Sequence, residues 1–98
     1  MLDVPFSTAV DEDTARGILD AVVERVSPPL EKQEALLEPI QVEGPLELTG
    51  GTVMYRLVGR AHANRLAEVR KAMIAGLRVE LAARKLLYEG GMIVQRVS

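Results

Sequence analysis

Hydrophobic and polar positions alternate along the first residues of the chain. Val4, Phe6, Thr8 and Val10 fall on one side of an extended segment, and more polar residues fall on the other. A period of two predicts a β-strand over residues 2–10. Pro5 has no N–H to donate, so we expect regular strand pairing to begin after it.

The pattern then changes to a helical period. Asp11, Glu12, Asp13 and Thr14 predict a helix start, because a short polar side chain can cap free backbone N–H groups and the acidic residues suit the positive end of a helix dipole. Apolar residues follow at three- and four-residue spacing. These are Ile18, Leu19, Val22, Val23 and Val26. Ser27-Pro28-Pro29 predicts the helix end, and residues 30–37 fit a short helical turn or a loop.

Two alternating runs joined by Gly50-Gly51 predict a β-hairpin, because tight hairpin turns need positive φ. A tip at these glycines predicts four apolar pairs on one face: Leu48–Val53, Leu46–Tyr55, Gly44–Leu57 and Ile40–Ala61. The other face then holds Gln41, Glu43 and Glu47 opposite Arg56 and Arg60, with Met54 and Val58 between them. Gly44-Pro45 is expected to mark a bulge or an edge position.

A second, longer helix is predicted after the hairpin. Asn64 is the expected cap, and the helix is expected to run to about Tyr88. Beyond Gly76 the apolar positions cover more of the helix circumference than one core contact requires. Gly90-Gly91 is a suitable helix stop, and residues 92–97 predict a final short strand.

The resulting order is β-α-β-β-α-β, the split βαβ or ferredoxin-like arrangement. It predicts an α+β fold with a four-stranded antiparallel sheet and two helices on one face. Residues 1–98 are expected to form a single domain. No apolar run approaches the roughly 18 residues that a membrane-spanning helix needs, and nothing near residue 1 resembles a signal peptide.

Charge divides the chain into two unlike halves. Residues 1–48 hold eleven acidic and three basic side chains, a net charge of −8, whereas residues 49–98 hold three acidic and nine basic ones, a net charge of +6. The total of −2 hides this split, which is a reason to look for partners. We expect the acidic and basic elements to meet, mostly within one subunit and otherwise between neighbouring copies.

The residues that usually carry catalysis or bind metals form no recognisable constellation. His62 is the only histidine and has no carboxylate at a ligand spacing, so an ordinary loop position is the better interpretation. Asp11-Glu12-Asp13 lacks the alternating oxygens and distal glutamate of a calcium loop, and the chain has no cysteine and no glycine-rich phosphate motif. We expect no enzymatic activity, no cofactor and no bound metal.

Nucleic-acid binding is also not expected. Related folds bind RNA by stacking bases on exposed aromatic residues. Tyr55 is the only aromatic residue in the two middle strands, and the predicted register places it on the apolar face. The basic residues of the second helix are mixed with Glu68, Glu80 and Glu89.

Three stretches of the chain resemble the carboxy-terminal cytoplasmic domain of small-conductance mechanosensitive channels, the MscS family. Residues 4–13 (VPFSTAVDED) look like the family's first strand and acidic helix start. Residues 37–44 and 46–57 are similar to its Glu-Pro-led hairpin, and Val69-Arg70-Lys71 and Gly90-Gly91-Met92 to its basic helix and the glycine before its last strand. The family's proline-rich ending is missing, and only Gln95-Arg96-Val97 is similar to it.

The resemblance implies a non-enzymatic assembly domain that forms part of a cytoplasmic cage of seven copies below a membrane pore. The full-length protein would then be a cell-membrane channel for ion efflux under osmotic stress, with its pore helix and middle β-domain upstream of these residues. The expected partner is a second copy of the chain. The expected subunit interface consists of Val79, Leu86, Leu87, Tyr88, Met92 and Val94.

The alternative is a freestanding regulatory domain of ferredoxin-like fold that binds a small molecule and acts as a dimer. A small enzyme is a more distant third. The gene upstream of Met1 distinguishes these interpretations, because the channel interpretation requires it to encode membrane helices.

Overall fold

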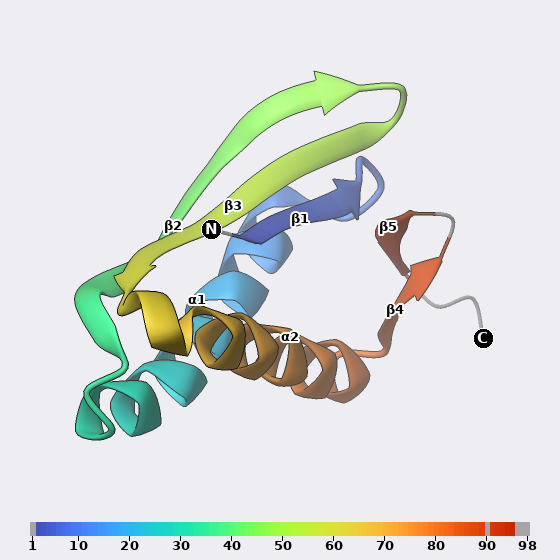
Figure 1. The fold of residues 1–98 in the computed structure, drawn as a ribbon. Helices are drawn as coiled ribbons and strands as arrows, with labels where there is room; N and C mark the ends of the chain where they lie inside the picture. The colour runs from blue at the N-terminus through green and yellow to red at the C-terminus, as the bar shows by residue number, and fades with distance from the viewer. Residues whose placement is uncertain (1, 90, 96–98) are drawn as a thin grey trace.

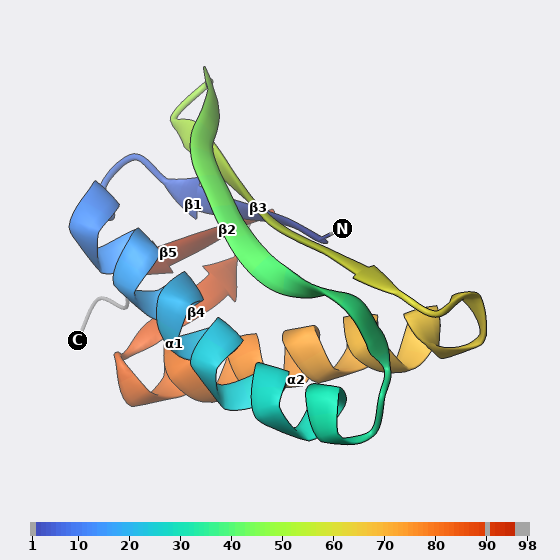
Figure 2. The ribbon, with the colours of Figure 1, turned by 90° about the vertical axis from the view of Figure 1, so that its left-hand side faces the viewer.

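A five-stranded mixed sheet and two α-helices make up the fold, in a computed structural model that describes residues 2–89 and 91–95 (Figure 1). The elements in chain order are β1 (Leu2–Ser7), α1 (Glu12–Lys32), β2 (Leu36–Thr49), β3 (Thr52–Ala61), a 3₁₀ helix η1 (Ala63–Arg65), α2 (Leu66–Ala83), β4 (Leu86–Glu89) and β5 (Met92–Gln95). Both helices lie on the same side of the sheet, as Figures 1 and 2 show from two directions.

The strand order in the sheet is β2-β3-β1-β5-β4. The predicted α+β class is confirmed, but the predicted four-stranded antiparallel sheet is wrong. The chain leaving α2 first forms β4 at the sheet edge, then turns and returns as β5 beside β1. Because of this extra reversal β5 runs parallel to β1, with Phe6 paired to Ile93, whereas the other strand pairs are antiparallel.

The second helix ends at Ala83, so its predicted extension to Tyr88 is wrong. Lys85 follows with φ 59°, a left-handed conformation that interrupts the helical path. The leucine-rich segment beyond it alternates, with Leu86 facing the core and Leu87 facing the other side of the sheet. The part of the apolar surplus at residues 86–88 therefore belongs to a strand, and the rest lies in α2. Gly91, with φ 83°, lies in the β4–β5 turn and does not stop a helix.

The remaining parts of these predictions fall outside the described residues. These parts are Gly90 in the predicted helix stop and residues 96–97 in the predicted last strand. The expected Asn64 cap is wrong as well, because α2 follows directly from η1 and neither helix start has a side-chain cap hydrogen bond.

The first helix begins as predicted and ends later than predicted. The Asp11 side chain accepts a hydrogen bond of 2.7 Å from the Thr14 backbone N–H, which confirms the cap. The helix continues through Pro28 and Pro29, which lie on its exposed side, and ends at Lys32. Leu30 is 3% exposed, so its burial holds the last turn in place although the prolines cannot donate helical hydrogen bonds.

The hairpin register is partly as predicted. Gly50 and Gly51 form the tip with φ 56° and 85°, and Leu48 pairs with Val53. Further from the tip, before Glu47 in the chain, the pairing shifts by two residues, so Val42 instead of Gly44 lies opposite Leu57. The predicted bulge at Gly44-Pro45 causes the shift. Because the shift is an even number of residues, the strand keeps its apolar side toward the helices.

Two further pairing predictions are wrong. Ala61 lies opposite Leu36, not Ile40, because β2 begins earlier than the alternating pattern suggested and contains further irregularities. Pairing of β1 with β3 runs without a break from Leu2, so Pro5 does not delay it. The parallel partner β5 contacts β1 at a single register position, Phe6, directly after the proline.

The core lies between the sheet and the two helices. Phe6 and Tyr55 pack edge to face there, with ring centroids 5.4 Å apart. At the helix contact, Gly76 of α2 faces α1 so closely that a Cβ atom on it would lie 2.7 Å from Val26 Cγ1. The absence of a side chain at this position lets the two helices approach.

Candidate assembly surface

The sheet face that the helices leave uncovered has a charged half and an apolar half. On the β2–β3 side its charges pair across strands. Arg56 Nε lies 2.7 Å from Asp3 Oδ1, and Arg60 Nη1 lies 3.3 Å from Glu38 Oε1. The Asp3 carboxylate, through its hydrogen bond and its charge, raises the pKa of Arg56 further above its ordinary value. Two ion pairs therefore join charged side chains across strands on this half.

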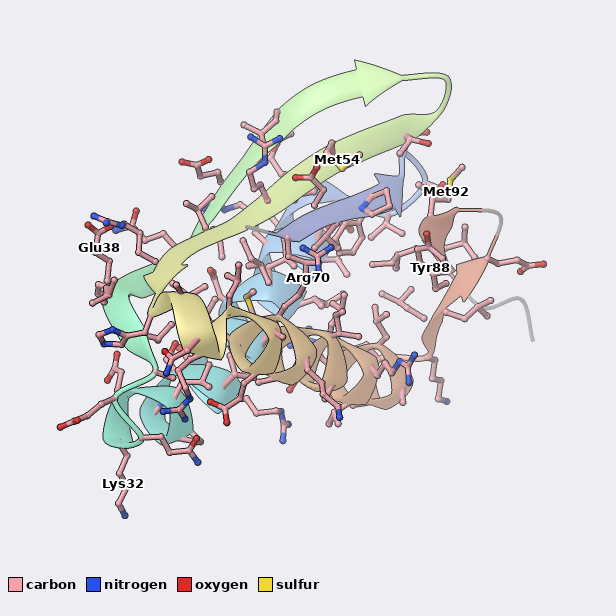
Figure 3. The ribbon with its side chains drawn as sticks, in the orientation of Figure 1. Lys32, Glu38, Met54, Arg70, Tyr88 and Met92 are labelled. Carbon is pink, nitrogen blue, oxygen red and sulfur yellow. The ribbon has the colours of Figure 1, made fainter. Side chains whose placement is uncertain are left out.

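The other half of this face is apolar and lies over β1, β5 and β4. We define the apolar strip as Pro5, Met54, Leu87, Met92 and Val94, all half-buried. The register joins them, because Pro5 pairs with Met54 and Leu87 pairs with Val94. Figure 3 shows Met54 and Met92 on this upper side of the sheet. The strip ends near Tyr88, whose 63% exposure is the highest among the exposed large apolar residues.

The structure brings together three of the six residues predicted to form a subunit interface. Leu87, Met92 and Val94 belong to the apolar strip, and Tyr88 is next to them on the opposite side of β4, where it pairs with Ile93. The other two lie elsewhere. Leu86 is 7% exposed and part of the core, and Val79 lies on α2 beside the cleft between the helices. Their role as an interface stays a prediction.

Sequence patterns pointed less clearly to two members of the strip. The hairpin alternation did place Met54 on the outer face, between charged neighbours. At Pro5 the sequence predicts only a delayed start of strand pairing. Only the parallel pairing of β1 with β5 reveals that both residues continue the apolar surface of the β4–β5 hairpin.

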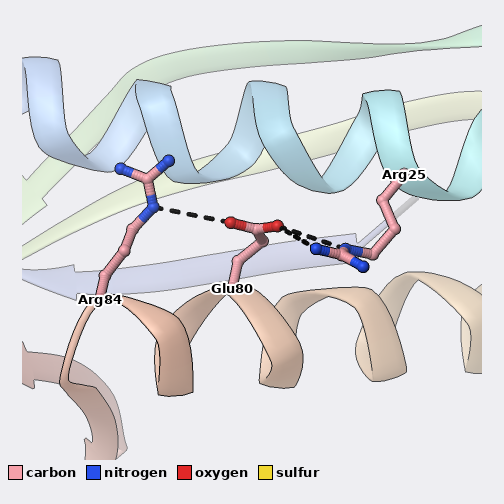
Figure 4. Close-up of polar contacts among 3 residues, drawn as sticks. All are labelled: Arg25, Glu80 and Arg84. Carbon is pink, nitrogen blue, oxygen red and sulfur yellow. Dashed lines mark hydrogen bonds and ion pairs between the residues drawn. The ribbon is translucent and has the colours of Figure 1, made fainter.

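The helical layer is held together by a carboxylate between two arginines (Figure 4). Glu80 Oε1 accepts hydrogen bonds from Arg25 Nη2 at 2.8 Å and Nε at 3.2 Å, and Glu80 Oε2 lies 3.6 Å from Arg84 Nε. The Glu80 side chain is only 11% exposed. The hydrogen bond from Arg25, and the charges of both arginines, hold the pKa of Glu80 below its ordinary value.

In the described part of the chain, the histidine and the acidic residues do not come together as a catalytic or metal-binding site. His62 is exposed and precedes η1. Among residues 2–89 and 91–95, no group of three or more histidine, aspartate or glutamate side chains is placed to hold a metal. Within the same residues, no helix combines the length and apolar character needed to cross a bilayer.

An apolar groove of about 300 Å³ lies where α2 meets β2 and β3, lined mainly by Ile40, Leu66, Val69 and Met73.

Comparisons of the chain with protein-family models, curated proteins and solved structures find no match. What the apolar strip can bind is therefore inferred from its own residues and their surroundings.

Proposed function

We propose that this chain is a non-enzymatic assembly domain that packs against copies of itself, as in the cytoplasmic cage of an MscS-like mechanosensitive channel. The observation that carries the proposal is the apolar strip on the uncovered face of the sheet. Burial of apolar surface is worth about 25 cal/mol per Å² removed from water. A contiguous apolar patch beside a polar surface is typical of a protein interface.

Two features of the surroundings support a protein partner. The charged half of the same face carries two cross-strand ion pairs, so it forms a polar rim next to the strip. The strip also reaches β4, an edge strand of four residues whose outer backbone groups face away from the sheet. An edge strand offers N–H and C=O groups to a neighbouring chain.

The resemblance to MscS domains extends the proposal. It implies a ring of seven copies, membrane helices encoded upstream, and ion efflux under osmotic stress in the full-length protein. On this proposal the domain lies on the cytoplasmic side of the cell membrane and contributes assembly, not conduction.

Sedimentation equilibrium on the chain over a range of concentrations tests self-association. The informative variant is Val94→Asp, which places a charge in the apolar strip. Val58→Asp is the matched control, because Val58 is half-buried on the same sheet face but pairs with Gln41 in the charged half. We expect Val94→Asp to weaken association at least tenfold and the control to weaken it much less. A chain that stays monomeric at every concentration would overturn the proposal.

A second candidate is small-molecule binding, favoured by the apolar groove between α2 and the hairpin. A groove with few polar groups suits a largely apolar ligand. The discriminating measurement is the melting temperature in the presence of small apolar acids, compared between the original chain and Leu66→Asp, which changes an exposed residue of the groove. A large ligand-dependent rise that this variant abolishes would favour the second candidate over assembly.

A further inference from the structure

The outer side of α1 carries a line of carboxylates. We define the acidic stripe as Asp13, Asp20, Glu24 and Glu31, all exposed. Their spacings of seven and four residues place them on one side of the helix, and they extend about 27 Å along it at 1.5 Å per residue. Among residues 2–89 and 91–95, no hydrogen bond or ion pair joins any of the four to another side chain.

The outer side of α2 has the opposite charge. We define the basic stripe as Lys71 and Arg78, both exposed, with Ile74 between them at 37% exposure. Within the described part of the chain neither cation has an ion-pair partner. The two cations are seven residues apart, which matches the spacing from Asp13 to Asp20 and from Glu24 to Glu31. Small exposed residues, Ala67 and Ala82, lie beside the stripe.

The two stripes cannot neutralise each other within one copy. The helices face each other through Val22, Arg25 and Val26 on α1 and Gly76 on α2. Helical periodicity turns each stripe away from this contact. The interhelical ion pair also has the reverse polarity, since the base, Arg25, is on α1 and the acid, Glu80, is on α2. The strong charge difference between the two helix surfaces therefore remains exposed.

We propose that the acidic stripe of one copy packs against the basic stripe of the next copy. Another copy of the chain fits as the partner because the two stripes are complementary in charge and share a seven-residue spacing. This spacing lets two carboxylates meet two cations along antiparallel or parallel helices. The two surfaces are different, so the contact is heterologous and generates a ring or an open chain. The proposal rests on the proposed assembly function and assigns it a second surface.

The stripes determine the orientation in which copies associate, because their ion pairs contribute little binding free energy. An exposed ion pair contributes at most about 1 kcal/mol, so two pairs alone do not hold a complex together. Complementary charges instead speed association and exclude wrong orientations. The small residues and Ile74 on α2 allow close approach and add apolar contact. The apolar strip, on the other face of the molecule, provides most of the affinity through a separate contact, and the stripes determine which helix surfaces of neighbouring copies meet.

The test exchanges the charges. One variant, Asp20→Lys with Glu24→Lys, leaves the acidic stripe with no net charge, and a second, Lys71→Glu with Arg78→Glu, makes both stripes acidic. We expect each alone to associate about tenfold more weakly than the original chain at low salt. We expect an equal mixture of the two to recover association, because the unchanged basic stripe of the first variant then meets the unchanged acidic stripe of the second. Lys32→Glu with Lys85→Glu is the control for the second variant, because it makes the same change in net charge outside both stripes.

Sedimentation equilibrium of these variants distinguishes failure of the stripe contact from failure of the proposed assembly. If both charge-exchanged variants associate like the original chain, the stripe contact is overturned and assembly itself stands. If the original chain does not associate at all, the proposed function is overturned together with the stripe contact. If folded variants fail to recover association when mixed, the stripes are not each other's partner. Circular dichroism melts of every variant confirm that the helices remain folded.

Discussion

Two regions of the molecule differ in how completely they are buried within one chain. They are the contact between α1 and α2 and the hairpin of β4 and β5. The helix contact is complete within one chain, since Gly76 lets the helices approach and Glu80 satisfies two arginines. The hairpin buries Leu86 and Ile93 against the core but leaves Leu87 and Val94 on its outer face, and Tyr88 is exposed on the side of Ile93. Apolar side chains on both faces of a strand indicate burial on both sides. Under the proposed function, another copy covers the outer face of the hairpin.

The largest expected effect is at the helix contact. Gly76→Val places methyl groups where a Cβ atom alone would be 2.7 Å from Val26 Cγ1, so the helices must separate. We expect a loss of about 3 kcal/mol in the free energy of unfolding, measured by urea denaturation. Ala75→Val, at the exposed neighbouring position, controls for the helix propensity of valine and should cost less than about 1 kcal/mol.

The hairpin comparison is sharpened by two neighbouring leucines. Leu86→Ala removes a core side chain and should cost about 2–3 kcal/mol of monomer stability. Leu87→Ala removes a half-buried one and should cost about 1 kcal/mol or less, while weakening self-association. Equal losses of monomer stability from the two variants, with no change in association, would contradict the division of the hairpin into a core side and a partner side.

The Glu80 cluster predicts a smaller effect that depends on pH. The folded-state pKa of Glu80 lies below its ordinary value of 4.5, so the charged carboxylate stabilises the fold above that pH. This contribution is lost as pH falls below 4.5 and through the lower, folded-state pKa. Glu80→Gln should therefore be less stable than the original chain near neutral pH, and the gap should close in acid. Glu24→Gln, an exposed control, should show no such gap.

The smallest effect is expected at a second helical glycine. Gly17 in α1 has only Arg84 Nη1, at 3.9 Å, near the position of an added Cβ atom. Gly17→Ala should therefore stabilise the protein by about 0.5–1 kcal/mol, because alanine favours the helix. Thermal denaturation measures the effect, and a loss of stability would show that the site is more crowded than the structure indicates.

Much of the fold is predictable because local signals agree with it. The Asp11 cap, the Gly50-Gly51 tip and the first helix each follow from backbone chemistry within a few residues. The failures come from tertiary effects that override such signals. Burial of Leu30 carries α1 past two prolines, and the β4–β5 hairpin recruits leucines that otherwise suit a helix.

The candidate surface was harder to predict because it joins distant parts of the chain. Leu87, Met92 and Val94 were expected at an interface for their apolar character, and the structure places them together. Pro5 and Met54 join them only through the strand order, which alternating patterns do not specify. The acidic and basic character of the halves was evident in sequence, but which charges pair internally depends on the helix contact.

The central claim is that the apolar strip meets another copy of the chain. Methionine methyl NMR tests it most directly, because Met54 and Met92 lie in the strip, whereas Met73 is 5% exposed in the core. With ¹³C-methyl methionine, the account predicts that the Met54 and Met92 signals shift together as the protein is concentrated and that the Met73 signal stays fixed. Signals of Met54 and Met92 that do not change with concentration would contradict it.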